Sequence, residues 1–283
     1  MHFGRVTIIG VGLLGASLGL ALKAHGLANR VTGVGRRQSS LDTALSTGAI
    51  DDATFDLREA VATADLIVLA TPAAEVIVKL DEIRDLCPAH TCITDVASTK
   101  ARICAHAAAL WPAPRPFVGA HPMAGSEKFG PEHGSADLYA GSICLVEDSP
   151  DLDPAARETI VRLWQAVGAE TVAIDPRRHD ALLARTSHIP HVLSAAIATL
   201  AERQGDVREL IGNGYRDMTR IAASRPEVWR DITMTNREAI LDGLDELQRH
   251  IESFSRALRE EDAAAIEAFF GAGRDARRDT VPE

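Results

Sequence analysis

The stretch that decides the fold is Val6-Thr7-Ile8-Ile9-Gly10-Val11-Gly12-Leu13-Leu14-Gly15, close to the N-terminus. An apolar run typical of a buried strand leads into the pattern G-x-G-x-x-G, and an Ala- and Leu-rich stretch, 16–24, then predicts a helix. The first glycine makes a tight turn, the second lets the backbone approach a pyrophosphate, and the third lets helix and strand pack closely. The helix start offers free N–H groups and the positive end of its dipole. These residues predict a dinucleotide site formed by Gly10, Gly12, Leu13, Leu14 and Gly15.

The first half of the chain alternates short apolar runs with helical patterns, which favours a doubly wound, mostly parallel sheet. We expect strands at 31–34, 66–69, 92–95, 117–119, 143–146 and 171–174, and helices at 41–47, 74–86 and 154–167. From Pro176 onward the strand signals stop, and 236–258 is the clearest helix because its apolar residues share one face. We therefore expect an α/β Rossmann domain at 1–175 and an all-α domain at 176–283.

The composition favours a cytoplasmic protein that binds small molecules. A length of 283 residues suits one large or two modest domains, and the net charge of −10 argues against nucleic acid or an anionic membrane as partner. Four cysteines without C-x-x-C spacing indicate reduced thiols. The first strand leaves no room for a signal peptide, and no apolar run is long enough to cross a bilayer.

The end of the second strand indicates which dinucleotide is bound. An acidic residue at this place holds the ribose hydroxyls of NAD, whereas here Gly35 is followed by Arg36, Arg37 and Ser39. Two guanidinium groups and a hydroxyl suit a 2′-phosphate, so the sequence favours NADP over NAD, although a solvated Arg-Arg turn is the plainer interpretation. The remaining residues assigned to the cofactor site follow later strands: Thr71, Pro72 and Ser98.

Four further segments carry polar residues where packing alone does not require them: 94–100, 119–128, 187–191 and 217–231. They contain T-D-V-A-S-T-K, H-P-M-A-G-S-E, S-H-I-P-H and D-M-T-R-I-A, in this order. Together with the glycine-rich turn, they closely resemble the prephenate/arogenate dehydrogenase family of tyrosine biosynthesis. The resemblance runs from about Val6 to Asp231 and is far more specific than the glycines alone.

The resemblance implies oxidation of a cyclohexadienyl alcohol, with hydride transfer to nicotinamide and loss of the ring carboxylate as CO₂. His121 is expected to accept the proton of the ring hydroxyl, and Ser98 to hydrogen-bond His121 and orient the nicotinamide. Arg220 is expected to bind a substrate carboxylate, with Asp217 holding its guanidinium. The resemblance assigns the other pocket positions to His188, His191, Trp229, Ser126 and Glu127.

Each of these residues also has a plainer interpretation. His121 is compatible with a strand-end histidine that only satisfies backbone groups, and Asp217 with Arg220 with an ordinary surface pair. His188 and His191 have a spacing that suggests a metal, but no third ligand follows from the spacing, so we expect no metal.

Two alternatives to this function stay open. Hydroxyacid dehydrogenases and imine reductases share a Rossmann-plus-helical plan, but many of the hydroxyacid enzymes use a lysine from the helical domain, and Lys128 is the last lysine of this chain. A non-catalytic NADP sensor has no reason to keep His121, Ser98 and Arg220 together. The substrate also stays open, because the loop at 126–130 favours prephenate and the Arg36-Arg37 turn favours arogenate.

The helical half predicts the oligomeric state. Residues 181–200 and 236–258 carry more apolar surface than a thin helical layer over one domain needs, so we expect a homodimer through these helices. After a last helical stretch at 263–270 no ferredoxin-like pattern follows, and we expect no appended amino-acid-sensing domain.

Overall fold

The computed structural model describes residues 1–125, 128–203, 205 and 208–280. Its centre is a six-stranded parallel sheet in the order β3-β2-β1-β4-β5-β6, with the crossover between β1 and β4 that is typical of dinucleotide-binding folds. The strands are β1 (Phe3–Ile9), β2 (Ala28–Val34), β3 (Asp52–Thr54), β4 (Leu66–Leu69), β5 (Cys92–Asp95) and β6 (Phe117–Val118). The expected α/β fold class is confirmed.

Helices cover both faces of this sheet, which is why β4 and β5 are buried at every position. One core cluster joins α1 and α6 to one face through residues such as Leu18 and Trp164, and a second joins α4 and α5 to the other through Leu80 and Ile103. The helices of this part are α1 (Leu13–Ala24), α2 (Gln38–Ser46), α3 (Leu57–Val61), α4 (Ala73–Ile83), α5 (Ala101–Leu110) and α6 (Pro154–Ala166).

A second, three-stranded sheet lies beside the first, in the order β7 (Ala120–Pro122), β8 (Ile143–Glu147) and β9 (Glu170–Ile174). The pairing of β7 with β8 is antiparallel, and that of β8 with β9 is parallel. The strands predicted at 143–146 and 171–174 therefore exist but belong to this separate sheet. The sequence did not reveal β7, which continues the chain from β6 after Gly119 and carries His121 at its centre.

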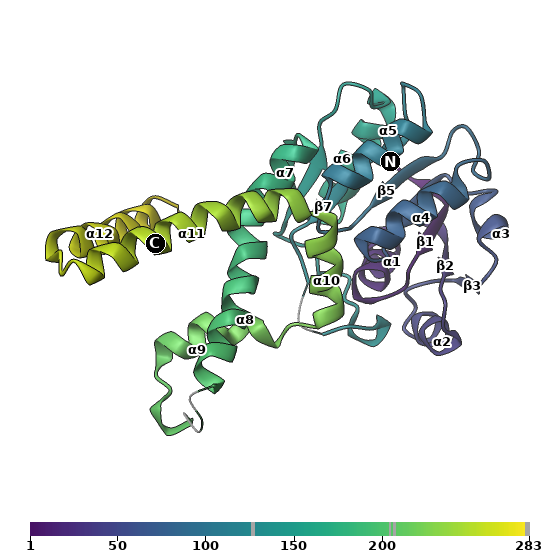
Figure 1. The fold of residues 1–283 in the computed structure, drawn as a ribbon. Coiled ribbons are helices and arrows are strands. Elements are labelled where there is room, and N and C mark those ends of the chain that lie inside the picture. The colour runs from purple at the N-terminus through teal and green to yellow at the C-terminus, as the bar shows by residue number, and fades with distance from the viewer. Residues whose placement is uncertain (126–127, 204, 206–207, 281–283) are drawn as a thin grey trace.

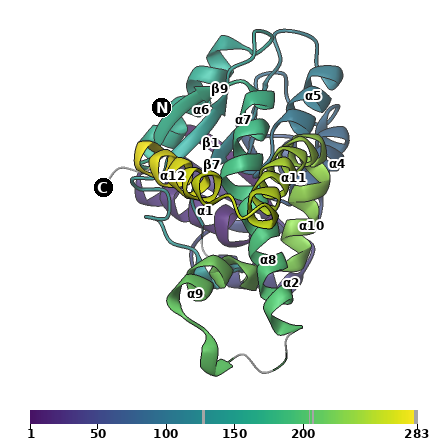
Figure 2. The ribbon, with the colours of Figure 1, turned by 60° about the vertical axis from the view of Figure 1, so that its left-hand side comes forward.

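The remainder of the described chain is helical, as expected. A nearly continuous rod of α7 (Pro176–Leu183), the π-helical turn η2 (Ala184–His188) and α8 (Ile189–Glu202) leaves the sheets, and α9 lies at its far end (Figures 1 and 2). The chain returns through α10, which packs on α4, and then projects as an arm of two antiparallel helices, α11 and α12. The elements after α8 are η3 (Arg208–Leu210), α9 (Asn213–Thr219), η4 (Arg220–Ala223), α10 (Pro226–Thr235), α11 (Arg237–Arg259) and α12 (Ala263–Thr280).

Two features bear on the predicted organisation. Asp175 lies between β9 and α7 and caps α7 by accepting hydrogen bonds from the amides of Arg177 and Arg178, both at 2.9 Å. The division of the chain at this residue stays a prediction. Within the described ranges, every helix is too short or too polar to cross a lipid bilayer.

Candidate active site

The glycine-rich turn has the geometry that a bound dinucleotide requires. Gly10 adopts φ +100°, and a Cβ atom there would lie 2.6 Å from the carbonyl oxygen of Ala70. A Cβ atom on Gly15 would lie 2.1 Å from the carbonyl oxygen of Gly10, so only glycine allows α1 to approach β1 this closely. Gly12 begins α1 without a side-chain cap among the described residues, and nothing lies within 4 Å of its missing Cβ. The space beside Gly12 is therefore open, and the first amides of α1, including those of Leu13 and Leu14, have no intrahelical acceptor, which suits a pyrophosphate.

The neighbouring strand ends fit the same ligand. Thr71 is the second residue after β4 and lies beside Gly10. Its Oγ1 is buried without a hydrogen-bond partner in the part of the chain that the structure describes. Pro72 is exposed at the start of α4. A buried polar atom without a partner is uncommon, and a bound cofactor is one way to satisfy it. The residues at this edge therefore fit a dinucleotide.

Residues 36–39, which follow β2, are exposed to solvent. Gly35 is followed by Arg36 and Arg37, which are exposed, and Ser39 is exposed in the first turn of α2. A Cβ atom on Gly35 would lie 2.9 Å from the side chain of Leu41, so a larger residue is disfavoured there. The chain thus presents two guanidinium groups, and no carboxylate, directly after β2.

His121 is the central titratable group of the second sheet. It pairs with Leu145 across β7 and β8 and is 8% exposed. Its Nδ1 lies 2.9 Å from Nε2 of His179, on α7. Burial is the main cause that lowers its pKa well below the ordinary value, and the nearby His179, Lys100 and His188 lower it further. The ring is therefore neutral at neutral pH, as a proton acceptor must be.

The predicted hydrogen bond between Ser98 and His121 is not formed within the described residues. Ser98 is half-buried in the turn between β5 and α5, whereas Nδ1 of His121 is engaged by His179. Since Nε2 of His121 makes no hydrogen bond among those residues, it is the atom left for a ligand.

A frame of buried polar groups fixes the position of β7. Lys100 and Asp95 form a buried ion pair, and Asp95 accepts a hydrogen bond from the amide of Ala120 at 3.0 Å. Asp180 accepts from the amides of Lys100 and Ala101, at 2.8 and 2.9 Å, and so caps α5 from a distant helix. The strand that carries His121 and the helix that carries His179 are thereby held against the same turn.

A second group of side chains lines the helical side. His188 is buried with Nδ1 3.0 Å from the side-chain Nδ2 of Asn236, and burial lowers its pKa to about 4. His191 stacks on Trp229 at 3.6 Å between ring centres, and its Nδ1 lies 2.9 Å from the carbonyl oxygen of Ser187. The structure thus brings His188, His191 and Trp229 together, as the sequence predicted.

The remaining predicted pocket residues are less constrained. Arg220 is exposed at the start of η4, and its charge lies close enough to His191 to lower the pKa of that ring, although burial is the larger cause. Asp217 is exposed on α9, and no ion pair joins it to Arg220 within the ranges described. Ser126 and Glu127 lie outside the described residues.

Three residues at this site have no motif that marks them in the sequence: His179, Asp180 and Asn236. One signal was available for the first two. Pro176, His179, Asp180 and Leu183 are buried at the spacing i, i+3, i+4, i+7, so two titratable residues fall on the apolar face of a short helix.

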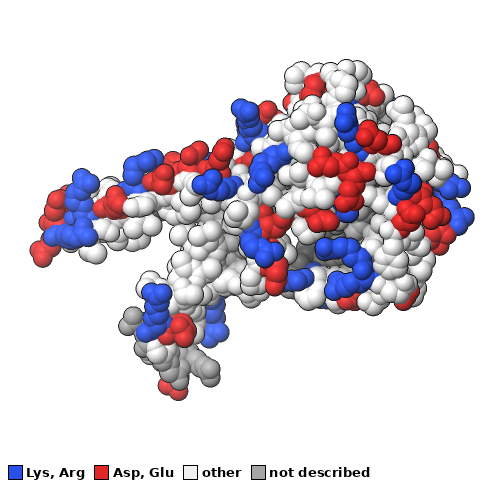
Figure 3. Space-filling model, turned by 45° about the vertical axis from the view of Figure 1, so that its right-hand side comes forward, with Lys and Arg blue, Asp and Glu red and all other residues white. Residues whose placement is uncertain are grey.

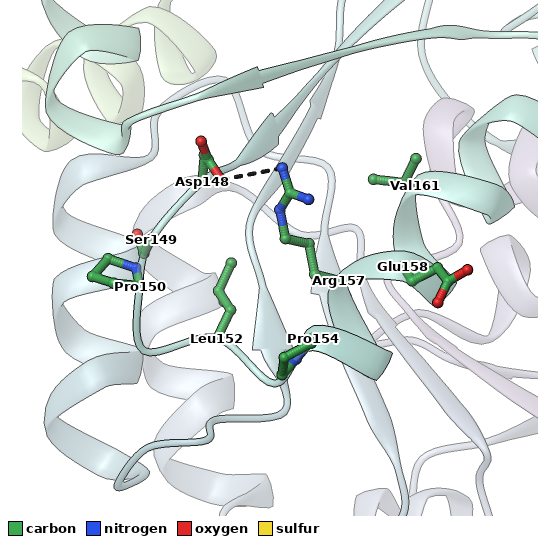
Figure 4. A pocket seen from close by; sticks show the side chains of 8 residues that line it. All are labelled: Asp148, Ser149, Pro150, Leu152, Pro154, Arg157, Glu158 and Val161. Carbon is green, nitrogen blue, oxygen red and sulfur yellow. Dashed lines mark ion pairs between the residues drawn. The ribbon is translucent and has the colours of Figure 1, made fainter.

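The hollow drawn in Figure 4 lies at another place in the fold. The hollow in Figure 4 has a volume of about 350 Å³ and lies between the end of β8 and α6. Arg157 and Asp148 form an ion pair across it at 3.1 Å. None of the predicted site residues lines it, and across the described residues no group of three or more His, Cys, Asp or Glu side chains is placed to hold a metal.

Comparisons with known proteins identify the family. Residues 18–173 match the family model "Prephenate dehydrogenase, nucleotide-binding domain", and residues 175–272 match "Prephenate dehydrogenase, dimerization domain". The chain belongs to the prephenate dehydrogenase family. The predicted family and enzyme class are confirmed: the chain is an NAD(P)-dependent dehydrogenase of the prephenate/cyclohexadienyl type, and its second half is a dimerisation domain.

Individual relatives agree with this assignment. The prephenate dehydrogenase of Bacillus subtilis is 32% identical over 98% of this chain and 76% of that protein. The crystal structure of Synechocystis arogenate dehydrogenase is 26% identical with a TM-score of 0.84, covering 98% of this chain and 100% of that one. The A. aeolicus prephenate dehydrogenase in complex with hydroxyphenyl propionate and NAD⁺ is 24% identical with a TM-score of 0.89, covering 98% of both chains, and shows the fold alone.

Proposed function

We propose that this prephenate dehydrogenase family member oxidises prephenate or arogenate, with His121 as the base that takes the proton of the ring hydroxyl. The observation that carries the proposal is a neutral, buried imidazole whose Nε2 is left for a ligand, on a strand tied to the carboxyl end of β5. In open α/β sheets ligands bind at this edge, and the glycine-rich turn ends at the same edge.

For this reaction the chain needs only to align the substrate with the nicotinamide and to provide one proton acceptor. Bound nicotinamide supplies the hydride acceptor for the ring carbinol carbon. His121 receives the hydroxyl proton at Nε2, and its burial keeps water away from the reacting hydroxyl. Loss of the ring carboxylate as CO₂ makes the product aromatic, and this supplies much of the driving force. Ser98, half-buried beside the turn into α5, is assigned to the orientation of the nicotinamide.

The helical side is assigned to substrate recognition. Arg220 offers an exposed guanidinium near His191, which suits a carboxylate of the substrate. Trp229, held by its stack on His191, offers an aromatic wall for the ring. His188 lies deeper in the same group, and Asp217, Ser126 and Glu127 keep the pocket roles that the family resemblance assigns to them.

We also propose NADP as the preferred cofactor, since Arg36 and Arg37 stand where an acid would hold the ribose of NAD. All four cysteines are free thiols, which supports a cytoplasmic location. The dimerisation domain and the apolar arm support a homodimer, with residues 1–175 and 176–283 as its two domains.

The test is a matrix of prephenate or arogenate with NAD⁺ or NADP⁺, in which reduced nicotinamide is followed. We expect turnover of at least one pair and a loss of about 10²–10⁴-fold in kcat for His121→Asn. His106→Asn, which alters a half-buried histidine on α5, is the matched control and should keep the wild-type rate. If folded, cofactor-binding protein reduces no cofactor with any of the four pairs, the hydroxyacid dehydrogenase and sensor alternatives have to be considered again.

The same assay tests the cofactor. Arg36→Ala combined with Arg37→Ala should raise the KM for NADP⁺ by about 10–100-fold, the loss expected for hydrogen bonds to a charged group, and leave the KM for NAD⁺ unchanged. The control is Arg84→Ala, which removes a guanidinium at the C-terminal end of α4, the end opposite to the predicted cofactor site. Equal effects on both cofactors would contradict a 2′-phosphate site.

A further inference from the structure

A buried chain of hydrogen bonds leads from His121, through His179, to Asp180. Its Nδ1 lies 2.9 Å from Nε2 of His179, and Nδ1 of His179 lies 2.8 Å from Oδ1 of Asp180. His179 is fully buried and Asp180 is 2% exposed. Two imidazole rings and one carboxylate therefore lie in series, and the ring of His121 is at the end that reaches the site.

The direction of each hydrogen bond follows from what each atom can donate. Asp180 already accepts from the amides of Lys100 and Ala101, so its oxygens act as acceptors, and Nδ1 of His179 must carry a proton. With one proton on its ring, His179 accepts at Nε2, and Nδ1 of His121 must then donate. This leaves Nε2 of His121 with a free electron pair, which is the form a base needs.

We propose that His179 and Asp180 are positioning residues that hold His121 in this tautomer and take up its charge when it accepts a proton. The proposal rests on the proposed function and adds to it two residues that no motif marked. When the substrate hydroxyl gives its proton to Nε2 of His121, the proton on Nδ1 moves to Nε2 of His179. The positive charge then lies beside the carboxylate of Asp180, and no other bond changes.

The surroundings of His121 favour this path. Lys100, at the start of α5, and His188, on η2, both disfavour a positive charge on the ring. Asp95, on β5, is already paired with Lys100. Among the described residues, Asp180 is the carboxylate that reaches His121 through a hydrogen-bonded side chain. Its partner His179 is therefore the route by which a charge on His121 can be stabilised in a buried site.

The kinetic test compares two substitutions of His179. His179→Leu removes the acceptor for Nδ1 of His121 and should lower kcat by about 10²-fold, because loss of the correct tautomer costs up to 10⁴-fold where a carboxylate orients a catalytic histidine. His179→Gln keeps an oxygen that can accept this proton and should recover about tenfold of the loss. The KM for the cofactor should be unchanged in both, and His106→Leu serves as the control.

The second readout does not depend on activity. In ¹⁵N-histidine NMR of the full chain without ligands, His121 should be neutral at pH 7 with its proton on Nδ1, and His179→Leu should lose this signature. A wild-type His121 that carries its proton on Nε2, or a His179→Leu variant with the wild-type kcat, would overturn the proposal. If the wild-type protein turns over none of the substrate pairs, the proposed function fails, while the NMR result still decides the role of His179.

Discussion

At the scale of single residues, we expect the pH dependence of catalysis to follow the protonation of His121, the proposed base. Its pKa is lowered below the ordinary value of 6.5 by burial and by the nearby His179, Lys100 and His188, so the neutral, active form persists as the pH falls to 6.5. We expect kcat/KM to stay level from pH 8 to pH 6.5 and to fall only below that, as His121 takes up a proton. A pH profile of kcat/KM, with circular dichroism at each pH as the control for folding, checks this. An acidic limb centred at or above pH 6.5 would contradict a buried base.

The sequence predicts candidate site residues where a motif names them, and it did not reveal the side chains that only the fold brings next to them. His121, His188, His191 and Trp229 stand in or close to the family motifs, and the structure places the last three together. His179 approaches His121 across 58 positions of the chain, and no local pattern encodes a contact of that separation. The expected partner Ser98 follows from the motif, whereas the observed partner follows from the packing of α7 against the start of α5.

At the scale of elements, the close fit of α1 against the fold depends on glycine beyond the cofactor turn. A Cβ atom on Gly19 would lie 2.1 Å from the carbonyl oxygen of Ala49, which is backbone and cannot rotate away. We expect Gly19→Ala to lower the free energy of unfolding by about 1–3 kcal/mol, the usual cost of overpacking. Urea unfolding at fixed protein concentration measures it.

The matched control for this substitution is Gly271→Ala, on α12, where nothing lies within 4 Å of the missing Cβ. Alanine is the better helix former, so this change should raise the free energy of unfolding by about 0.5–1 kcal/mol. Opposite signs at the two sites would show that the contact with Ala49, and not the loss of glycine as such, is responsible. A Gly19→Ala variant as stable as the wild type would exclude this explanation.

Elements with a long apolar run or a clear period were predictable, and short or mixed ones were not. The strands β1, β4 and β5 contain apolar runs, although β5 also buries Thr94 and Asp95, and all three were expected within a few residues of their bounds. The three-residue strands β3 and β7 were missed, because Asp-Ala-Thr and Ala-His-Pro have no strand pattern. Their pairing with longer neighbours makes them strands, and this tertiary contribution is absent from local sequence.

At the scale of the whole molecule, the arm of α11 and α12 extends away from both sheets (Figure 1). Phe254 contacts Phe269 and Phe270, which joins the two helices of the arm to each other. In Figure 3 charged side chains lie along one side of the arm and mostly uncharged atoms along the other. Ile251 and Leu258, on α11, are 50% and 58% exposed, although the apolar period of this helix predicts their burial. An arm of this kind, in a dimerisation domain, lacks the surface that would bury it within one chain.

We propose that a second copy of the chain covers this surface, and this gives the prediction that belongs to the whole molecule. The wild-type protein should be a dimer at micromolar concentration by light scattering, and Ile251→Asp combined with Leu258→Asp should shift it to a monomer, because two carboxylates would be buried without partners in the interface. Ser253→Asp introduces a single carboxylate on the opposite side of α11, about 200° around the helix from Ile251, and should leave the dimer intact. A wild-type protein that is monomeric at this concentration would contradict the proposed homodimer. A Leu258→Asp and Ile251→Asp variant that stays dimeric would instead move the interface away from the arm, toward the half-exposed apolar face of α8.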